Sequence, residues 1–260
     1  NLIILPGVPL EMEKMLLSYL DFQNFLKIDN SNVVTINTAG IYETKLSKKM
    51  QSFMKKYNKK VYFSFLPSYE GVKIRLTGLD ARFNINIIKK ELLKFLSEYV
   101  YGIDKVTLEI AVSNIIKKNK LKLSLAESCT GGFISKRITD IPGSSVFFLG
   151  GIVAYDNDIK RNILGVSNDD IVKFGAVSKQ VSESMAINVF QKFKSDISIA
   201  CTGISGPDGG LEDKPVGTVY ISLKYLDKLM TKKFIFRVDR KSHRIMTKQA
   251  ALYMLWKLIK

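Results

Sequence analysis

The sequence predicts an α/β protein, in which a layered α/β domain follows a small α+β domain of βαββα order. Three observations lead to this fold class. Strand-like and helical apolar patterns alternate from about residue 104 onward, which is typical of a layered α/β domain with its sites in loops at strand ends. A shorter βαββα pattern occupies residues 31–102. Hydrophobic residues make up 46 % of the 260 residues, enough to fill a real core.

The first 102 residues divide into two parts. Residues 1–30 contain a turn at 5–9 and a helix at 11–26, and we expect them to be the remnant of a preceding domain. Asn1 is not a start methionine, so we expect the chain to be a piece of a longer protein. The small domain is predicted to have strands at 33–38, 61–66 and 72–77, helices at 43–57 and 85–100, and a turn at 67–71.

The layered domain is expected over residues 103–260. A first helix is indicated by one apolar face made of Leu108, Ala111, Val112, Ile115 and Ile116. Further strands are predicted at 121–125, 152–155, 197–201, 217–225 and 233–238, and further helices at 132–139, 178–193 and 242–258.

The composition limits the kind of partner and the compartment. The net charge of +16 permits a nucleic-acid or phosphate partner, but the lysines are scattered over amphipathic helices, where they favour a solvated surface, so nucleic acid is an unlikely partner. No apolar run approaches the roughly 20 residues of a membrane helix, and no signal peptide is expected. Cys129 and Cys201 form no CxxC pair, which indicates neither a disulfide framework nor a zinc site and suggests the reducing cytoplasm.

The first loop with chemical potential is Ala-Glu-Ser-Cys-Thr-Gly-Gly at 126–132, between a predicted strand and a predicted helix. Its small residues let the backbone approach a ligand, and the following helix N-terminus favours negative charge. Such a turn also exposes a nucleophile beside backbone N–H groups that stabilise an oxyanion. The plainer alternative is a simple joint between a strand and a helix.

Two further loops follow strands. In the segment 154–160, Tyr155 and Lys160 would on their own be surface residues. The segment 202–210 holds four glycines in nine residues, and its backbone N–H groups are suited to a phosphate. A hairpin-like turn is the alternative, which is weaker because so long a glycine-rich loop in a compact domain is more often functional.

The chain has one histidine, His243, which we interpret as a polar residue in the first turn of the last helix. A histidine-based metal site is therefore nearly excluded, and a Ser-His-Asp triad is possible only if His243 is recruited. If Ser128 is a nucleophile, its base is then expected to be a lysine or a tyrosine. We expect no metal and no cofactor.

Five motifs resemble the CinA C-terminal amidase family (competence/damage-inducible protein A) in order and spacing over about residues 104–258. Residues 31–102 are similar to the family's KH-like middle domain, although the GxxG loop of a KH domain is missing. Residues 5–9, with Glu11 and Met12, resemble the end of its molybdopterin-binding-like domain, whose pyrophosphatase activity on ADP-ribose is not carried over. The five motifs are 126–132, 139–145, Tyr155 with Asn157 and Lys160, 175–178, and 203–210 with 214–218.

The resemblance implies hydrolysis of nicotinamide mononucleotide to nicotinate mononucleotide and ammonia, without a metal. By motif position, Ser128 resembles the nucleophile, and Tyr155 and Lys160 the pair that activates it. Either Lys160 accepts the proton, for which its pKa must fall from about 10.4 toward neutrality, or it stays charged and activates Tyr155 as the base. The substrate-binding residues are expected to be Thr130, Gly131, Gly132, Gly203, Ser205, Gly206, Gly209, Gly210 and Arg240.

The residues around these positions leave some alternatives open. Glu127 and Cys129 are interpreted as packing or loop-shaping residues, with Cys129 a minor candidate for the nucleophile. Val238 stands where the family usually has glycine before Asp-Arg, which makes a phosphate contact of Arg240 and Arg244 less secure. We expect a homo-oligomer, namely a dimer, that acts in pyridine nucleotide salvage. The rival functions are a catalytically silent interaction protein in competence or DNA damage response, and a nucleic-acid-binding protein.

Overall fold

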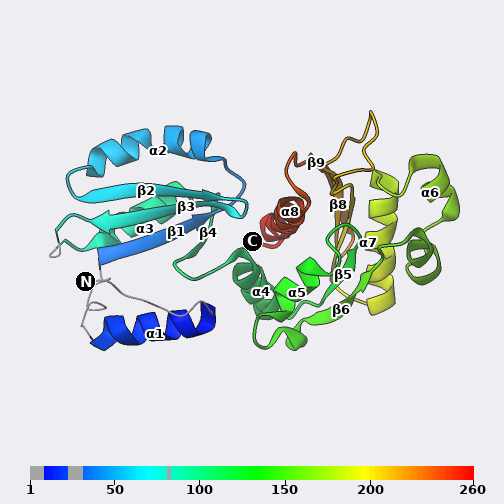
Figure 1. Ribbon diagram of the computed structural model, residues 1–260, viewed down its shortest axis with the longest axis horizontal. Helices are drawn as coiled ribbons and strands as arrows, with labels where there is room; N and C mark the ends of the chain where they lie inside the picture. The colour runs from blue at the N-terminus through cyan, green and yellow to red at the C-terminus, as the bar shows by residue number, and fades with distance from the viewer. Residues whose placement is uncertain (1–8, 23–31, 81–82) are drawn as a thin grey trace.

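The computed structural model describes residues 9–22, 32–80 and 83–260, and it contains two β-sheets with their own helices. Figure 1 shows the smaller sheet on one side, the larger sheet on the other, and helices between them. No helix among the described residues is both long enough and apolar enough to cross a membrane. The mixed α/β class predicted from the sequence is confirmed.

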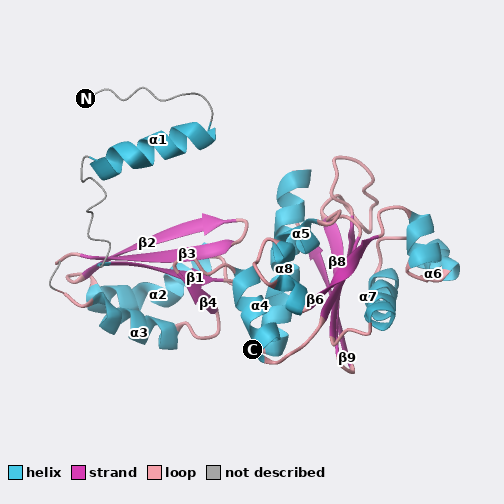
Figure 2. Ribbon diagram, turned by 90° about the horizontal axis from the view of Figure 1, so that it is seen from below, coloured by secondary structure: helices cyan, strands magenta, loops and turns pink. Residues whose placement is uncertain are grey.

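The smaller unit is a four-stranded antiparallel sheet of order β2-β3-β1-β4 with two helices on one face. Leu46 and Met50 of one helix and Ile88 of the other share a single core with the sheet, and Figure 2 shows both helices on the same side. Its elements are β1 (Val33–Thr38), α2 (Glu43–Tyr57), β2 (Val61–Ser68), β3 (Gly71–Gly78), α3 (Ile85–Phe95) and β4 (Val100–Ile103).

The predicted βαββα order is wrong at its end, because the helix expected over 85–100 stops at Phe95. The N–H of Tyr99 then bonds to the carbonyl of Leu96, and the chain re-enters the sheet as β4 beside β1. The unit is therefore βαββαβ, the ferredoxin-like order. The predicted turn at 67–71 shrinks to two residues, Tyr69 and Glu70, and Pro67 lies within β2, which tolerates it as an edge strand.

The N-terminal helix α1 (Pro9–Phe22) confirms the start of the predicted helix at 11–26, and residues 23–26 lie outside the described residues. The predicted turn at 5–9 lies outside them as well, except for Pro9, which begins α1.

The larger unit is a five-stranded sheet of order β6-β5-β7-β8-β9, in which β5 runs parallel to β6 and β7 and the last strands are antiparallel. The helices α4, α5 and α8 cover one face, and α6 and α7 cover the other (Figure 1). The elements are α4 (Leu108–Lys118), β5 (Leu123–Glu127), α5 (Phe133–Thr139), β6 (Phe148–Val153), a π-helix (Ile159–Ile163), α6 (Asn168–Phe174), α7 (Lys179–Phe193), β7 (Ile197–Gly203), β8 (Thr218–Tyr225), β9 (Lys228–Ile235) and α8 (Arg240–Ile259).

The central strand β5 is buried on both faces, so its side chains pack in the cores on both sides of the sheet. Leu123 and Leu125 pack in the core that includes α8, whereas Ala126 packs in the core beneath α7. Small residues on the α7 side let that helix approach closely, and the hydroxyl of Ser198 donates to the carbonyl of Ala186 over 2.7 Å. The sheet is thus the middle layer of a three-layer α/β/α domain.

Two strands begin at least four residues before their predicted starts. β6 begins at Phe148, four residues before the predicted start, and so includes Gly150 and Gly151, which interrupt its apolar pattern. Gly150 lies under the ring of Phe193, where a Cβ would come within 2.9 Å of a ring carbon. β9 begins at Lys228 rather than 233, since Leu226 and Asp227 close a two-residue turn that has neither glycine nor proline.

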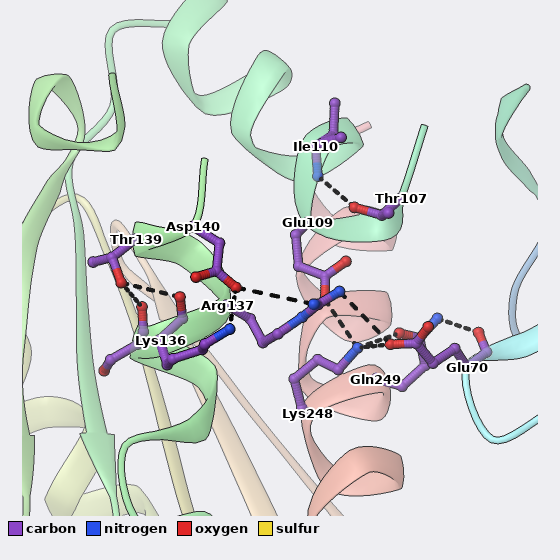
Figure 3. Close-up of polar contacts among 11 residues, drawn as sticks. Glu70, Thr107, Glu109, Ile110, Lys136, Arg137, Thr139, Asp140, Lys248 and Gln249 are labelled. Atoms are coloured by element: carbon purple, nitrogen blue, oxygen red, sulfur yellow. Dashed lines mark hydrogen bonds and ion pairs between the residues drawn. The ribbon is translucent and has the colours of Figure 1, made fainter. Parts of the chain in front are cut away.

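A network of charged side chains joins the two units (Figure 3). The fully buried amine of Lys248 in α8 donates to Glu109 of α4 over 2.9 Å and also to Glu70 in the β2–β3 turn. Arg137 of α5 donates to the same Glu109 carboxylate over 2.9 Å. Because Glu70 belongs to the smaller unit, the contact ties the β2–β3 hairpin to three helices of the larger one.

Candidate active site

Three loops meet at one edge of the larger sheet. β5, β6 and β7 are parallel neighbours, so their carboxyl ends point the same way and the segments that follow them converge. A cavity of about 180 Å³ opens between these segments. It is lined by Ser128, Cys129, Tyr155, Asn157, Lys160, Ala176, Val177, Thr202, Gly203, Ser205 and Arg240.

The first loop is shaped by Glu127, the last residue of β5. Its buried carboxylate accepts hydrogen bonds from the Thr130 hydroxyl at 2.7 Å and from the backbone N–H groups of Ile134 at 3.0 Å and Ser135 at 2.8 Å. The N-cap of α5 is Gly132, which has no side chain to cap the helix, so Glu127 satisfies these N–H groups from outside the helix. The interpretation of Glu127 as a loop-shaping residue is confirmed.

Ser128 stands at the end of β5 with little solvent exposure and lines the cavity. Its N–H donates to the carbonyl of Cys201 over 3.0 Å, which fixes the turn against β7. Within the described residues, no backbone carbonyl accepts from the N–H groups of Cys129 or Thr130. Unpaired backbone N–H groups next to a nucleophile are the kind of donor that stabilises an oxyanion.

Cys129 is an unsuitable nucleophile in this setting. The Cys201 thiol beside it, its burial and the nearby Glu127 charge all raise the pKa of the Cys129 thiol well above its ordinary value. A thiol acts as a nucleophile only as the thiolate, so Cys129 stays protonated and inert. Its interpretation as a packing residue is consistent with this environment.

Lys160 reaches the cavity from the π-helix that follows β6. It is only 2 % exposed, and its amine donates to the carbonyl of Tyr155 over 3.1 Å. Burial lowers the pKa of Lys160, and the opposing effects of Asp156 and Cys129 do not reverse that shift. A lysine held this way is more readily deprotonated than one on the surface.

Tyr155 lies at the mouth of the cavity, 58 % exposed, and its hydroxyl accepts a hydrogen bond from the Arg240 guanidinium. The other end of that guanidinium donates to the carbonyl of Gly206 over 2.9 Å, so Arg240 connects the second loop with the third. Asp239 caps α8 by accepting from the N–H groups of Lys241 and Ser242, which places Arg240 at the helix start, over the cavity.

The predicted substrate-binding residues divide into two groups. Gly203, Ser205 and Arg240 line the cavity together with the three predicted catalytic residues. The side chain of Thr130 is fully buried and hydrogen-bonded to Glu127 and Cys201, and Thr130 is not among the residues that line the cavity. The remaining predicted positions, all glycines, are outside the cavity lining: Gly131, Gly132, Gly206, Gly209 and Gly210.

Arg244 is also placed differently from the expected phosphate contact. Its guanidinium donates two hydrogen bonds to the carbonyl of Thr130, at 3.0 and 2.6 Å, and so holds the first loop against α8. It is absent from the lining of this cavity. The arrangement assigns Arg244 to shaping the nucleophile loop.

Sequence reasoning missed the role of His243. It lies in the first turn of α8, as predicted, but it is fully buried and hydrogen-bonded to the Ser205 hydroxyl at 2.9 Å. The two residues are 38 positions apart, so no local pattern indicates the contact. Thr202 was also missed, and its hydroxyl donates to the carbonyl of Ala176, another residue of the cavity wall.

Comparison with known proteins identifies the family of this chain. A putative competence-damage inducible protein of Halothermothrix orenii is 39 % identical over 269 residues, covering 100 % of this chain and 64 % of that protein. A CinA-like protein of Amoebophilus asiaticus is 40 % identical over 230 residues, covering 85 % of this chain and 55 % of that protein. The chain thus spans between about half and two thirds of the length of these relatives.

Solved structures give the same result. The competence/damage inducible protein CihA from Agrobacterium tumefaciens is 37 % identical with a TM-score of 0.56, covering 57 % of this chain and 91 % of that one. A CinA superfamily protein from Escherichia coli is 31 % identical with a TM-score of 0.57, covering 58 % of this chain and 88 % of that one. The family model described as the CinA C-terminal domain matches residues 105–259. The chain therefore belongs to the CinA family.

Proposed function

We propose that the protein hydrolyses the carboxamide of nicotinamide mononucleotide, giving nicotinate mononucleotide and ammonia. The observation that supports this most is that Ser128, Tyr155 and Lys160 come from two separate loops yet line one cavity, where the lysine is buried. A serine activated by a neighbouring lysine or tyrosine is a known arrangement for acyl transfer that needs no histidine.

In the proposed reaction, Lys160 in its neutral form takes the proton of the Ser128 hydroxyl, whose oxygen attacks the carboxamide carbon. The N–H groups of Cys129 and Thr130 face the oxyanion of the tetrahedral intermediate. Ammonia leaves with the proton from Lys160, and water then hydrolyses the acyl-enzyme and restores the free hydroxyl. The lowered pKa of Lys160, caused by burial, favours the lysine as the proton acceptor. Tyr155 as the base is the alternative, with Lys160 charged beside it.

The size of the cavity bears on how the substrate would lie. At about 180 Å³ it is smaller than the roughly 300–1,000 Å³ of typical small-molecule pockets. We infer that the nicotinamide ring occupies the cavity while the ribose phosphate lies outside it, toward Arg240 and the glycine-rich loop 203–210. The backbone N–H groups of such a loop and an arginine both suit a phosphate.

The first experiment is an assay of ammonia release from nicotinamide mononucleotide. We expect Ser128→Ala to abolish release without unfolding the protein, and Cys129→Ala to keep most of it. Ser145→Ala, at an exposed serine of the same domain, is the matched control. An active Ser128→Ala protein together with an inactive Cys129→Ala protein would contradict the assignment. Wild-type protein that releases no ammonia would favour the catalytically silent alternative.

A further inference from the structure

Ser205 and His243 form a buried polar pair in the wall of the cavity. Ser205 follows β7 in the third loop, lines the cavity and is 5 % exposed. Its Oγ lies 2.9 Å from Nδ1 of His243, and Nε2 of the same ring lies 3.2 Å from the carbonyl oxygen of Gly217. The ring of His243 also packs against the ring of Phe236, with the centroids 6.0 Å apart and the planes at 65°.

These contacts fix which atom carries each hydrogen. Burial lowers the pKa of His243, and the charge of Arg240 lowers it further, so the ring is neutral near pH 7 and has one N–H. A backbone carbonyl only accepts, so the N–H must be at Nε2, facing Gly217. Nδ1 is then an acceptor, and the hydroxyl of Ser205 must donate its hydrogen to it.

The orientation of the Ser205 hydroxyl decides what it offers the cavity. Its single hydrogen points at His243, so the oxygen presents only lone pairs to a ligand. Ser128 and Cys129 line the same cavity, and no backbone carbonyl among the described residues accepts from the N–H groups of Cys129 and Thr130. The lining thus has an acceptor at Ser205, and the proposed reaction uses the two N–H groups after Ser128 as donors. A carboxamide has the complementary pattern, because its carbonyl oxygen accepts and its NH₂ group donates.

We propose that Ser205 accepts a hydrogen bond from the NH₂ group of the substrate carboxamide, and that His243 is the positioning residue that keeps the Ser205 hydroxyl in this role. The identity of the substrate rests on the proposed function above; the acceptor character of the Ser205 oxygen does not. A carboxylate or an ester has no N–H in this place, so neither gains the hydrogen bond. The pair thus selects the amide over its own acid product, which favours release of that product.

The first test compares two substrates, nicotinamide mononucleotide and the methyl ester of nicotinate mononucleotide. Ser205→Ala should lower kcat/KM for the amide roughly 3- to 10-fold, the value of one lost neutral hydrogen bond. The ester never uses the contact, so its kcat/KM should stay within about twofold. A purely structural role of Ser205 would lower both substrates equally, and that result would overturn the proposal.

Substitutions of His243 separate positioning from packing. Glutamine has one acceptor and one donor and should retain most of the amide preference in His243→Gln. Methionine has neither, so His243→Met frees the Ser205 hydroxyl to donate and should bring the amide-to-ester ratio down to that of Ser205→Ala. Equal ratios in His243→Met and the wild type would contradict the positioning role. If His243→Met does not fold, Ser205→Ala still decides the proposal.

A binding measurement tests the same inference without turnover. In the Ser128→Ala background, calorimetry should show nicotinamide mononucleotide binding at least about 3-fold tighter than nicotinate mononucleotide. Adding Ser205→Ala should reduce that preference. Ammonia release without such discrimination means that only the Ser205 inference is wrong. Amide-selective binding without ammonia release means that only the proposed reaction is wrong. Failure to bind either mononucleotide overturns both.

Discussion

At the scale of single residues, burial changes the protonation of two side chains in the cavity in opposite senses. The amine of Lys160 loses hydration and its pKa falls, whereas the thiol of Cys129 is buried against Cys201 and its pKa rises. Burial is the main cause for Lys160, whereas for Cys129 the hydrogen bond with the Cys201 thiol comes first and burial second. As a result the neutral form is favoured in each case, which makes the lysine a better base and the cysteine a poorer nucleophile.

The lowered pKa of Lys160 predicts the direction of the pH dependence. Only the neutral amine accepts a proton, so kcat/KM should fall as the pH drops below the pKa of Lys160. Because that pKa is lowered, the fall should occur at a pH below the ordinary lysine pKa of about 10.4. Lys160→Met removes the base and should lower kcat about 100- to 10,000-fold. Lys160→Arg should lower kcat to a similar extent, because arginine stays protonated. Rate profiles against pH for the three proteins check this.

Tyr155 and Lys160 should act on the same proton transfer. Tyr155→Phe should then lower kcat by about 100- to 10,000-fold as well, and the double variant should be little worse than the poorer single variant. Initial rates of the two single variants and the double variant at saturating substrate measure this. Multiplicative losses would show that the two residues serve separate steps, and near-wild-type rates in both single variants would remove them from the mechanism.

At the scale of elements, the position of Ser128 depends on how α5 begins. A glycine N-cap leaves the first N–H groups of a seven-residue helix without a side-chain acceptor, and Glu127 supplies one from the preceding strand. The same carboxylate accepts from Thr130, so the turn that contains Ser128 is bound at both ends. The geometry of the nucleophile is thus set by a strand end and a helix start acting together.

Glu127→Ala should both destabilise the domain and reduce activity. It removes the acceptor for buried N–H and hydroxyl groups, which should lower the free energy of unfolding by about 1–3 kcal/mol. Because the turn is then free to move, kcat should fall more than KM rises. Urea unfolding and initial rates measure the two effects. Glu212→Gln, at an exposed glutamate in the third loop, is the control and should change neither. Unchanged kcat in a destabilised Glu127→Ala protein would mean that the turn does not position Ser128.

At the scale of the whole molecule, the two units are joined by charges rather than by apolar packing alone. Lys248 and Glu109 are almost completely buried, and Glu70 and Arg137 extend the network to the β2–β3 hairpin and to α5 (Figure 3). Breaking a buried pair leaves an uncompensated charge, so the contact depends on every partner. Arg137 belongs to α5, and the turn that contains Ser128 leads into the start of that helix. Contiguous contacts therefore connect the β2–β3 hairpin to the cavity.

The network predicts a loss of stability in acid. Burial by itself raises the pKa of Glu109, but Lys248 and Arg137 outweigh it and lower that pKa from 4.5 to about 2. A carboxylate with a lowered folded-state pKa stabilises the protein above its unfolded pKa, and the contribution is lost as the pH falls from about 4.5 to about 2. The size of the loss should be about 3 kcal/mol.

Urea unfolding at several pH values, followed by the fluorescence of the single tryptophan, Trp256 in α8, measures this loss. Glu109→Gln should be less stable at pH 7 and should depend less on pH between 4.5 and 2. Glu98→Gln breaks an exposed ion pair with Lys257 and should change the stability by less than about 1 kcal/mol. An unchanged acid dependence in Glu109→Gln would contradict the assignment.

Local sequence patterns were enough to predict several helices and strands and the loops that carry the motifs. α2 has the predicted bounds, Glu43–Tyr57, because its apolar positions recur at helical spacing. The order of strands and helices around the first loop placed Ser128 at a strand end before any contact was known. A local pattern suffices there because neighbouring residues decide whether a helix starts or a strand stops.

The tertiary structure alone decided what depends on distant residues. β4 is four residues long and exists because it pairs with β1, more than 60 positions earlier. The burial that lowers the pKa of Lys160 comes from segments packed around it, and the Ser205 hydroxyl is hydrogen-bonded to a histidine 38 residues away. The β2–β3 hairpin meets α8 through Glu70 and Lys248, 178 positions apart. Short segments carry too little pattern of their own, and protonation depends on the surrounding charges and solvent, which only the folded chain brings together.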